Sequence, residues 1–259
     1  MQDKLKVALV QTSLIWESPK ENRAVLSEKI RSIKSDVDVI VLPEMFTSGF
    51  TMNPDAVTET MDGTTIKWMK TLAKDVDAAI CGSLVISEDA NYYNRFVFVK
   101  PDASIVFYDK RHTFTLAGED KVYKSGNENI LITYKGWKIR PLICYDLRFP
   151  VWARNIDNYD MLIYVANWPK PRVNAWDALL KARAIENMSY CIGVNRVGVD
   201  ANDLEYSGHS NVYNGLGDAQ IQLSDAQEGI AVTVLDKNHL IAIRESLRFL
   251  NDRDSFIIN

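Results

Sequence analysis

Short apolar runs alternate along this chain with segments in which apolar residues recur at helical spacing. Between residues 20 and 35, Val25, Leu26, Ile30 and Ile33 fall on one stripe, which predicts an amphipathic helix. Similar spacing predicts helices at residues 64–75, 174–189 and 238–247. Apolar and β-branched runs predict strands at residues 5–11, 38–43, 78–87, 92–100, 104–110, 129–134, 137–144, 161–166, 191–195, 210–213, 220–223 and 230–235.

The order of these elements predicts an α/β protein. Pro101-Asp102 and Lys135-Gly136 separate pairs of strands and favour hairpins in the middle of the chain. Strands alternate with helices on either side of these hairpins, which indicates mixed sheets covered by helices. The runs at residues 39–42 and 161–166 are apolar enough to be buried on both faces. A two-sheet sandwich with outer helices satisfies this burial, but a single doubly wound sheet has the same periodicity.

Length and composition narrow the class of protein. The chain has 259 residues, of which 47% are hydrophobic, and it contains no linker-like segment. We therefore expect one domain over residues 1–259, with residues 249–259 as a C-terminal tail. A net charge of −4 argues against a nucleic-acid surface. No signal peptide or membrane span is visible, which favours a cytoplasmic protein.

Neither the cysteines nor the histidines form a metal or disulfide pattern. Cys81, Cys144 and Cys191 are odd in number and lack CxxC spacing, which is typical of reduced thiols in the cytosol. We expect Cys81 and Cys191, which lie inside strands, to be small buried groups. The three histidines are scattered along the chain and do not make a zinc signature.

Three chemically complementary residues each follow a predicted strand. Cys144 ends one run and precedes a turn and an apparent helix at residues 147–152, while Glu44 and Lys110 end two others. A thiol, a carboxylate and an ammonium can serve as nucleophile, base and oxyanion-stabilising cation in amide hydrolysis. Alone, each residue also fits a structural interpretation, as a buried cysteine, a solvated carboxylate or a surface charge. Their joint occurrence at strand ends favours catalysis.

Neighbouring residues suggest two further interpretations. His112 raises the possibility of a Cys–His dyad, although Lys110 fits the required chemistry better. We expect Asp146 and Arg148 to form turn hydrogen bonds and an ion pair that fix the turn after Cys144.

Over nearly its whole length the chain resembles the carbon–nitrogen hydrolase (nitrilase-like) superfamily. The resemblance runs through KVALVQT, LPEMF, YDKRH, CYDLRFPVW, NWP and ARAIEN. It implies a four-layer α-β-β-α sandwich of two mixed β-sheets flanked by helices. It also implies that Cys144 is the nucleophile, Glu44 the general base and Lys110 the oxyanion cation, with the backbone N–H of Tyr145 as a second donor. Glu119, in FTLAGEDKVYKSG, corresponds to a second glutamate that positions the lysine and the substrate amide.

EMFTSGFTM, CYDLRFPVWARN and YVANWPKPR are most similar to the ω-amidase branch of this superfamily. Those enzymes are implied to hydrolyse the terminal amide of 2-oxo dicarboxylic acid monoamides such as 2-oxoglutaramate, without a metal or organic cofactor. We expect Arg172 to bind the substrate carboxylate and Trp168 to wall the pocket or simply pack. The resemblance also implies a homodimer. An N-carbamoyl hydrolase, a general aliphatic amidase and a non-catalytic scaffold remain as alternatives.

Overall fold

Two six-stranded sheets form the centre of the structure, a computed structural model that describes residues 2–258. The first sheet contains, in spatial order, β14 (Gly229–Asp236), β1 (Lys4–Gln11), β2 (Val39–Val41), β3 (Ala79–Glu88), β4 (Asn91–Val99) and β5 (Ile105–Asp109). The second contains β13 (Ala219–Gln222), β12 (Asn211–Tyr213), β9 (Tyr190–Asn195), β8 (Met161–Ala166), β7 (Trp137–Ile143) and β6 (Ile132–Tyr134). A separate hairpin pairs β10 (Val197–Val199) with β11 (Glu205–Ser207).

Both sheets are mixed and share one pattern of pairing. Read from β14 in the first sheet and from β6 in the second, neighbouring strands pair antiparallel, parallel, parallel, antiparallel and antiparallel. Each parallel pair needs a crossover connection, and helices supply it. The two-sheet sandwich predicted from the sequence is therefore confirmed, and a single doubly wound sheet is excluded.

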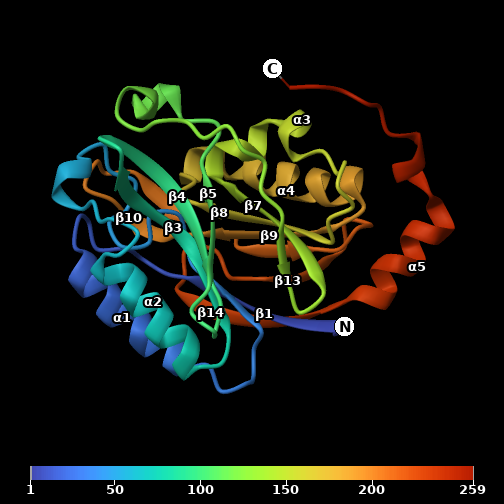
Figure 1. Cartoon of the computed structure of the whole chain (residues 1–259), viewed down its shortest axis with the longest axis horizontal. Helices are drawn as coiled ribbons and strands as arrows, with labels where there is room; N and C mark the ends of the chain where they lie inside the picture. The colour runs from blue at the N-terminus through green and yellow to red at the C-terminus, as the bar shows by residue number, and fades with distance from the viewer. Residues whose placement is uncertain (1, 259) are drawn as a thin grey trace.

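Helices cover the outer faces of the two sheets (Figure 1). On one side lie α1 (Pro19–Arg31) and α2 (Thr64–Asp75), and on the opposite side lie α3 (Pro150–Ala153) and α4 (Val173–Asn187). The last helix, α5 (Lys237–Leu247), lies at the side of the sandwich (Figure 1). Within the predicted tail, Phe249–Asp252 forms a short 3₁₀ helix, η6, and residue 259 lies outside the described residues.

The alternation of side chains along β1 shows why these strands are apolar throughout. Leu5, Val7 and Leu9 belong to the core between the two sheets, whereas Ala8 and Val10 pack with residues of α1 and α2. Successive strand residues point to opposite faces, so a strand covered on both sides has to be apolar at every position.

The structure departs from several predicted elements; for example, the apparent helix at residues 147–152 is a 3₁₀ helix over Cys144–Arg148 followed by α3. The helix expected at residues 20–35 ends at Arg31, because polar residues follow, and Ile33 packs on the core from outside the helix. The hairpin of β10 and β11 was not predicted, since both strands are three residues long and enclose a polar turn. Short strands of this kind carry too little alternation to be read from sequence.

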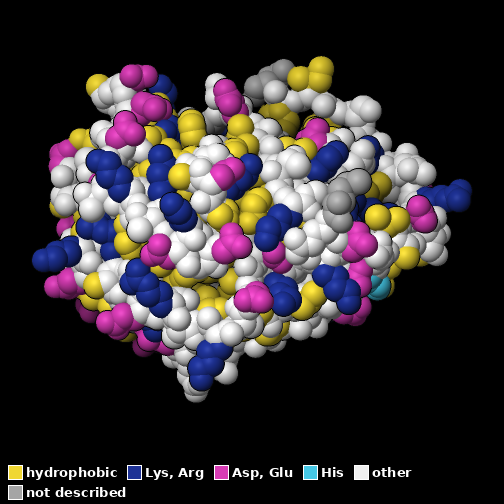
Figure 2. Space-filling model, turned by 60° about the horizontal axis from the view of Figure 1, so that its bottom comes forward, with side chains coloured by type: hydrophobic (Ala, Val, Ile, Leu, Met, Phe, Trp, Pro, Cys, Tyr) yellow, Lys and Arg dark blue, Asp and Glu magenta, His cyan; other side chains and the backbone are white. Residues whose placement is uncertain are grey.

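Two features of the described residues are the mixed charge of one face and the length and composition of the helices. Lysine and arginine side chains alternate with acidic ones on the face shown in Figure 2, without a continuous basic area there. From residue 2 to residue 258, no helix combines the length and the apolar composition that crossing a bilayer requires.

Candidate active site

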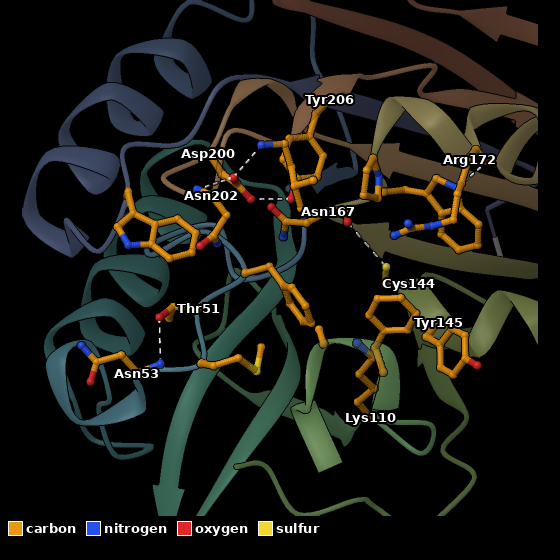
Figure 3. Close-up of a pocket in the computed structure, with 18 of the residues that line it drawn as sticks. Thr51, Asn53, Lys110, Cys144, Tyr145, Asn167, Arg172, Asp200, Asn202 and Tyr206 are labelled. Carbon is orange, nitrogen blue, oxygen red and sulfur yellow. Dashed lines mark hydrogen bonds between the residues drawn. The ribbon is translucent and has the colours of Figure 1, made fainter. Parts of the chain in front are cut away.

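Cys144 lies at the sharp turn predicted from the sequence. It follows β7 directly, begins the 3₁₀ helix η4 (Cys144–Arg148) and has a φ of 44°. A residue other than glycine in this left-handed region is strained, and such strain is common at functional turns. The turn presents the thiol to a cavity of about 580 Å³ (Figure 3). Its lining includes Trp16, Glu17, Phe50, Met52, Lys110, Phe114, Tyr145, Arg148, Trp168, Arg172, Asp200 and Tyr206.

Beside this thiol, one buried ammonium joins two buried carboxylates. Lys110 Nζ lies 2.9 Å from Glu44 Oε1, and 3.0 Å and 2.9 Å from the two carboxylate oxygens of Glu119. Both glutamates are fully buried and Lys110 is 1% exposed. Glu44 follows β2, Lys110 follows β5 and Glu119 begins the 3₁₀ helix η3 (Glu119–Lys121). The structure thus brings together all four residues that the family resemblance implied for catalysis.

Two asparagines hold these carboxylates in place. Asn94 Nδ2 donates to Glu44 Oε1 at 2.8 Å and to Glu119 Oε1 at 3.1 Å. Asn167 donates its backbone N–H to Glu44 Oε2 at 2.8 Å and its side-chain amide to the Glu44 carbonyl at 2.6 Å. Sequence reasoning missed both residues as site residues. Asn167 follows a predicted strand and could have been suspected, whereas Asn94 lies within one.

An ion pair between neighbouring strands fixes the approach of Asn94 to Lys110. Arg95 and Asp109 are register partners in β4 and β5, and the guanidinium contacts both carboxylate oxygens, at 2.7 and 2.9 Å. Bidentate pairs of this type restrain orientation as well as distance. Asn94 and Lys110 are the adjacent residues along each strand, so the ion pair positions them next to each other.

The charges of this cluster act on the thiol in opposite directions. Burial raises the pKa of Cys144 well above its ordinary value, and the Glu44 carboxylate raises it further, while Lys110 lowers it. Burial alone would lower the pKa of Lys110, but the charges of Glu119 and Glu44 raise that pKa above its usual value. The lysine is therefore a permanent cation, and the thiol is protonated near neutral pH.

The residues expected to contact substrate all line the cavity. Tyr145 packs edge-on against Phe114, and Trp168 is 3% exposed, with its indole N–H donating to the Arg172 carbonyl. The Arg172 guanidinium lies 5.3 Å from the centre of the Phe114 ring. Trp168 therefore forms part of the cavity wall while it packs against its neighbours.

The expected ion pair between Asp146 and Arg148 is absent from residues 2–258. Arg148 instead lines the cavity, with its guanidinium 4.9 Å from the centre of the Trp168 ring. Asp146 accepts hydrogen bonds from Tyr108 and His112. The predicted turn hydrogen bond is present, because Asp146 also accepts the N–H of Ile143, whereas the predicted ion pair is not, since the other partners of Asp146 come from the segment around β5.

His112 does not form a dyad with Cys144. Its ring contacts the Asp146 carboxylate through Nδ1 at 2.7 Å and stacks on Phe149. Cys81 and Cys191 are buried in the core, as predicted. Across the described part of the chain, no three His, Cys, Asp or Glu side chains are grouped to hold a metal ion.

Known proteins match this chain over nearly its whole length. The sequence profile of the carbon–nitrogen hydrolase family matches residues 6–245. The chain is 43% identical over 253 residues to the omega-amidase YafV of Escherichia coli K12, covering 97% of this chain and 98% of that protein. It is 30% identical over 254 residues to 2-oxoglutaramate amidase of Bacillus subtilis 168, covering 96% and 97% of the two chains.

Solved structures share the fold. XC1258 from Xanthomonas campestris, described as a CN-hydrolase superfamily protein with an arsenic adduct in its active site, superposes with a TM-score of 0.97. It is 38% identical, and the alignment covers 100% of both chains. Nit3 of Saccharomyces cerevisiae has the same fold at 22% identity, with a TM-score of 0.85 and 95% of both chains covered.

Replacing Glu44 should make the Cys144 thiolate form at lower pH. The Glu44 charge raises the pKa of the thiol, so Glu44→Gln lowers it. The pH midpoint for alkylation of Cys144 by iodoacetamide should therefore move to lower pH than in the wild type. Peptide mapping, with Cys144→Ala as the control, assigns the label. An unchanged or higher midpoint would show that Glu44 does not act on the thiol.

Proposed function

Because this chain belongs to the carbon–nitrogen hydrolase family, we propose that it is an ω-amidase acting through Cys144, Glu44 and Lys110. It hydrolyses the terminal amide of 2-oxo dicarboxylic acid monoamides such as 2-oxoglutaramate, releasing ammonia and the 2-oxo diacid. The observation that carries this proposal is the convergence of the thiol with the buried Glu44–Lys110–Glu119 cluster on one cavity. The full-length similarity to an omega-amidase and a 2-oxoglutaramate amidase supports the choice of substrate.

In the first half-reaction, Cys144 Sγ attacks the amide carbon while Glu44 takes the thiol proton. A protonated thiol needs such a base at the moment of attack, and a positioned base contributes about 10²–10⁴-fold. Lys110 stabilises the oxyanion together with the Tyr145 N–H, because the first N–H groups of a helical segment have no partner within it. The tetrahedral intermediate then expels ammonia, which leaves with the proton returned by Glu44.

In the second half-reaction, water hydrolyses the thioester. Glu44 again acts as the base and removes a proton from the attacking water. Collapse of the second tetrahedral intermediate breaks the C–S bond, releases the carboxylic acid and restores the thiol. Glu119 holds Lys110 in place throughout, since both of its carboxylate oxygens contact the ammonium.

Two cations that lack acidic partners can bind the substrate carboxylate. Within the described residues, the guanidinium groups of Arg172 and Arg148 lie against the rings of Phe114 and Trp168 and not against a carboxylate, and both residues line the cavity. The acidic residue Asp200 lies across the cavity from Arg172 (Figure 3) and is engaged by the Tyr206 hydroxyl. We assign the carboxylate to Arg172, with Arg148 contributing positive charge, because a guanidinium can bind a carboxylate in bidentate fashion.

Mass spectrometry during turnover should detect the acyl-enzyme. The intact mass with 2-oxoglutaramate should rise by that of the acyl group, and Cys144→Ala should show no adduct. Ammonia release should be fastest with 2-oxoglutaramate among that substrate, glutamine, a carbamoyl amino acid and a small aliphatic amide. Preference for the carbamoyl amino acid or the aliphatic amide would select one of the alternative hydrolases. Inactivity towards all four, with unreactive Cys144, would indicate a non-catalytic scaffold.

Removing the Arg172 guanidinium should weaken binding of the charged substrate alone. Arg172→Ala should raise KM for 2-oxoglutaramate by roughly tenfold or more, the value of a charge-assisted hydrogen bond, and leave a neutral amide unaffected. Lys170→Ala is a matched control, because Lys170 lies in the same short helix but pairs with Glu205 outside the cavity. Equal losses with both substrates would exclude Arg172 as the carboxylate site. A larger KM change in Arg148→Ala would assign the carboxylate to Arg148 instead.

We further propose that the protein is a cytoplasmic homodimer. Apolar side chains exposed on α5 and the segment after it, including Phe249 at 59% and Ile257 at 89%, support self-association. Three unpaired cysteines suit a reducing compartment. Sedimentation equilibrium should give about twice the chain mass of 29.4 kDa. A mass of one chain would contradict the dimer, and recovery in a membrane or periplasmic fraction would contradict the location.

A further inference from the structure

Asp146 is a fully buried carboxylate to which the proposed reaction assigns no step. Its Oδ2 accepts hydrogen bonds from the Ile143 N–H at 3.0 Å and the Tyr108 hydroxyl at 2.8 Å. Its Oδ1 accepts the His112 N–H at 3.0 Å and contacts His112 Nδ1 at 2.7 Å. Each carboxylate oxygen therefore accepts one backbone N–H, and each also has a side-chain partner, the Tyr108 hydroxyl or the His112 ring.

The residues that contact Asp146 lie next to the proposed nucleophile and the proposed cation in the sequence. Ile143 immediately precedes Cys144, whereas Tyr108 and His112 lie two residues before and two residues after Lys110. Cys144 directly follows β7 of the second sheet, and Lys110 directly follows β5 of the first. Asp146 is thus a direct link between the two sheets at the site where thiol and ammonium meet.

The partners of Asp146 are themselves held rigidly. The Tyr108 hydroxyl accepts hydrogen bonds from the Trp152 indole at 3.0 Å and from the Arg111 N–H at 3.1 Å. Burial and the charge of Asp146 raise the pKa of Tyr108 well above its ordinary value, so the hydroxyl remains a donor. The His112 ring stacks on Phe149 with 3.6 Å between ring centres and an interplanar angle of 3°.

We propose that Asp146, with Tyr108 and His112, is a positioning group that sets the distance between Cys144 Sγ and Lys110 Nζ. It touches no substrate and transfers no proton. This inference rests on the proposed roles of Cys144 and Lys110. A displacement of about 1 Å at a reacting centre can reduce the rate roughly 100-fold, so a small shift of either segment changes kcat strongly.

Asp146→Asn tests this role with little change of volume. One carboxylate oxygen becomes an NH₂ donor, which then faces a backbone N–H, either that of Ile143 or that of His112. Neither N–H can reverse its role, although the Tyr108 hydroxyl and the His112 ring can. One of the two segments must therefore move away. We expect kcat to fall about 10- to 100-fold, with KM for 2-oxoglutaramate changed less than about threefold.

Asp160→Asn is the matched structural control. Asp160 is also buried, and its Oδ2 accepts the N–H of Lys138 at 2.8 Å near the opposite end of the same strand, β7. It should lower Tm while leaving kcat within about twofold of the wild type, as expected for a site without contact to the reacting groups. A kcat for Asp146→Asn that falls no further than that for Asp160→Asn would overturn the proposal.

A double mutant tests whether Tyr108 acts through Asp146. Tyr108→Phe should lower kcat in the wild type but have little further effect in Asp146→Asn, because residues of one network are not additive. Full additivity would contradict the network. If Asp146→Asn does not fold, the kcat values of Tyr108→Phe and His112→Ala test the proposal instead, since each variant removes a partner of Asp146 and keeps Asp146 itself. Wild-type kcat in both would overturn the proposal.

Alkylation of Cys144 separates this inference from the proposed function. If the wild type hydrolyses no amide, the function fails, but the geometry can still be measured with iodoacetamide. Lys110 lowers the pKa of Cys144 and Glu44 raises it, so a changed separation in Asp146→Asn should move the alkylation midpoint away from that of the wild type. A midpoint equal to that of Asp160→Asn would show that Asp146 does not position the pair.

Discussion

The active centre depends on one ammonium shared by two carboxylates that are both shielded from water. Charges buried in this way are costly unless each has close partners, and here Lys110 lies within 3.0 Å of Glu44 and Glu119. The three residues come from two connections: Glu44 from the one after β2, and Lys110 and Glu119 from the one between β5 and β6. Because each buried charge needs the others as close partners, the cluster holds these connections together at one edge of the sandwich.

This cluster also explains the protonation state of Cys144, the proposed nucleophile. Burial, Glu44 and Glu119 raise the pKa of Cys144 while Lys110 lowers it, and the raising effects prevail, so the thiol keeps its proton at rest. A carboxylate adjacent to a protonated thiol is suited to general-base catalysis, in which the proton moves as the C–S bond forms. The same carboxylate can return that proton to departing ammonia. The raised pKa of Cys144 and the proposed acid–base role of Glu44 thus both follow from the carboxylate beside the thiol.

Selectivity would arise in the rest of the cavity, which is unevenly charged. Arg172 and Arg148 lie over the aromatic rings of Phe114 and Trp168, which restrict the guanidinium groups without neutralising them. The wall that contains Asp200 and Tyr206 comes from the β10–β11 hairpin, a unit outside both main sheets. The chemistry is thus built on rigid strand ends, and the far wall on a separate small element, which is a common division in enzymes.

The sequence by itself determined most of the strands and helices, though not the β10–β11 hairpin, and singled out the three residues proposed to react. Strands that are buried on both faces form continuous apolar runs, which can be recognised in the sequence. A polar residue directly after such a run can be recognised as well, as with Glu44, Lys110 and Cys144. Only the tertiary structure decided the contacts between distant segments. Asn94 reaches Glu44 through the pairing of β4 with its neighbours, and Asp146 bonds to Tyr108 and His112 rather than to nearby Arg148. Hydrogen-bond partners depend on the packing of one sheet against the other, which local periodicity does not encode.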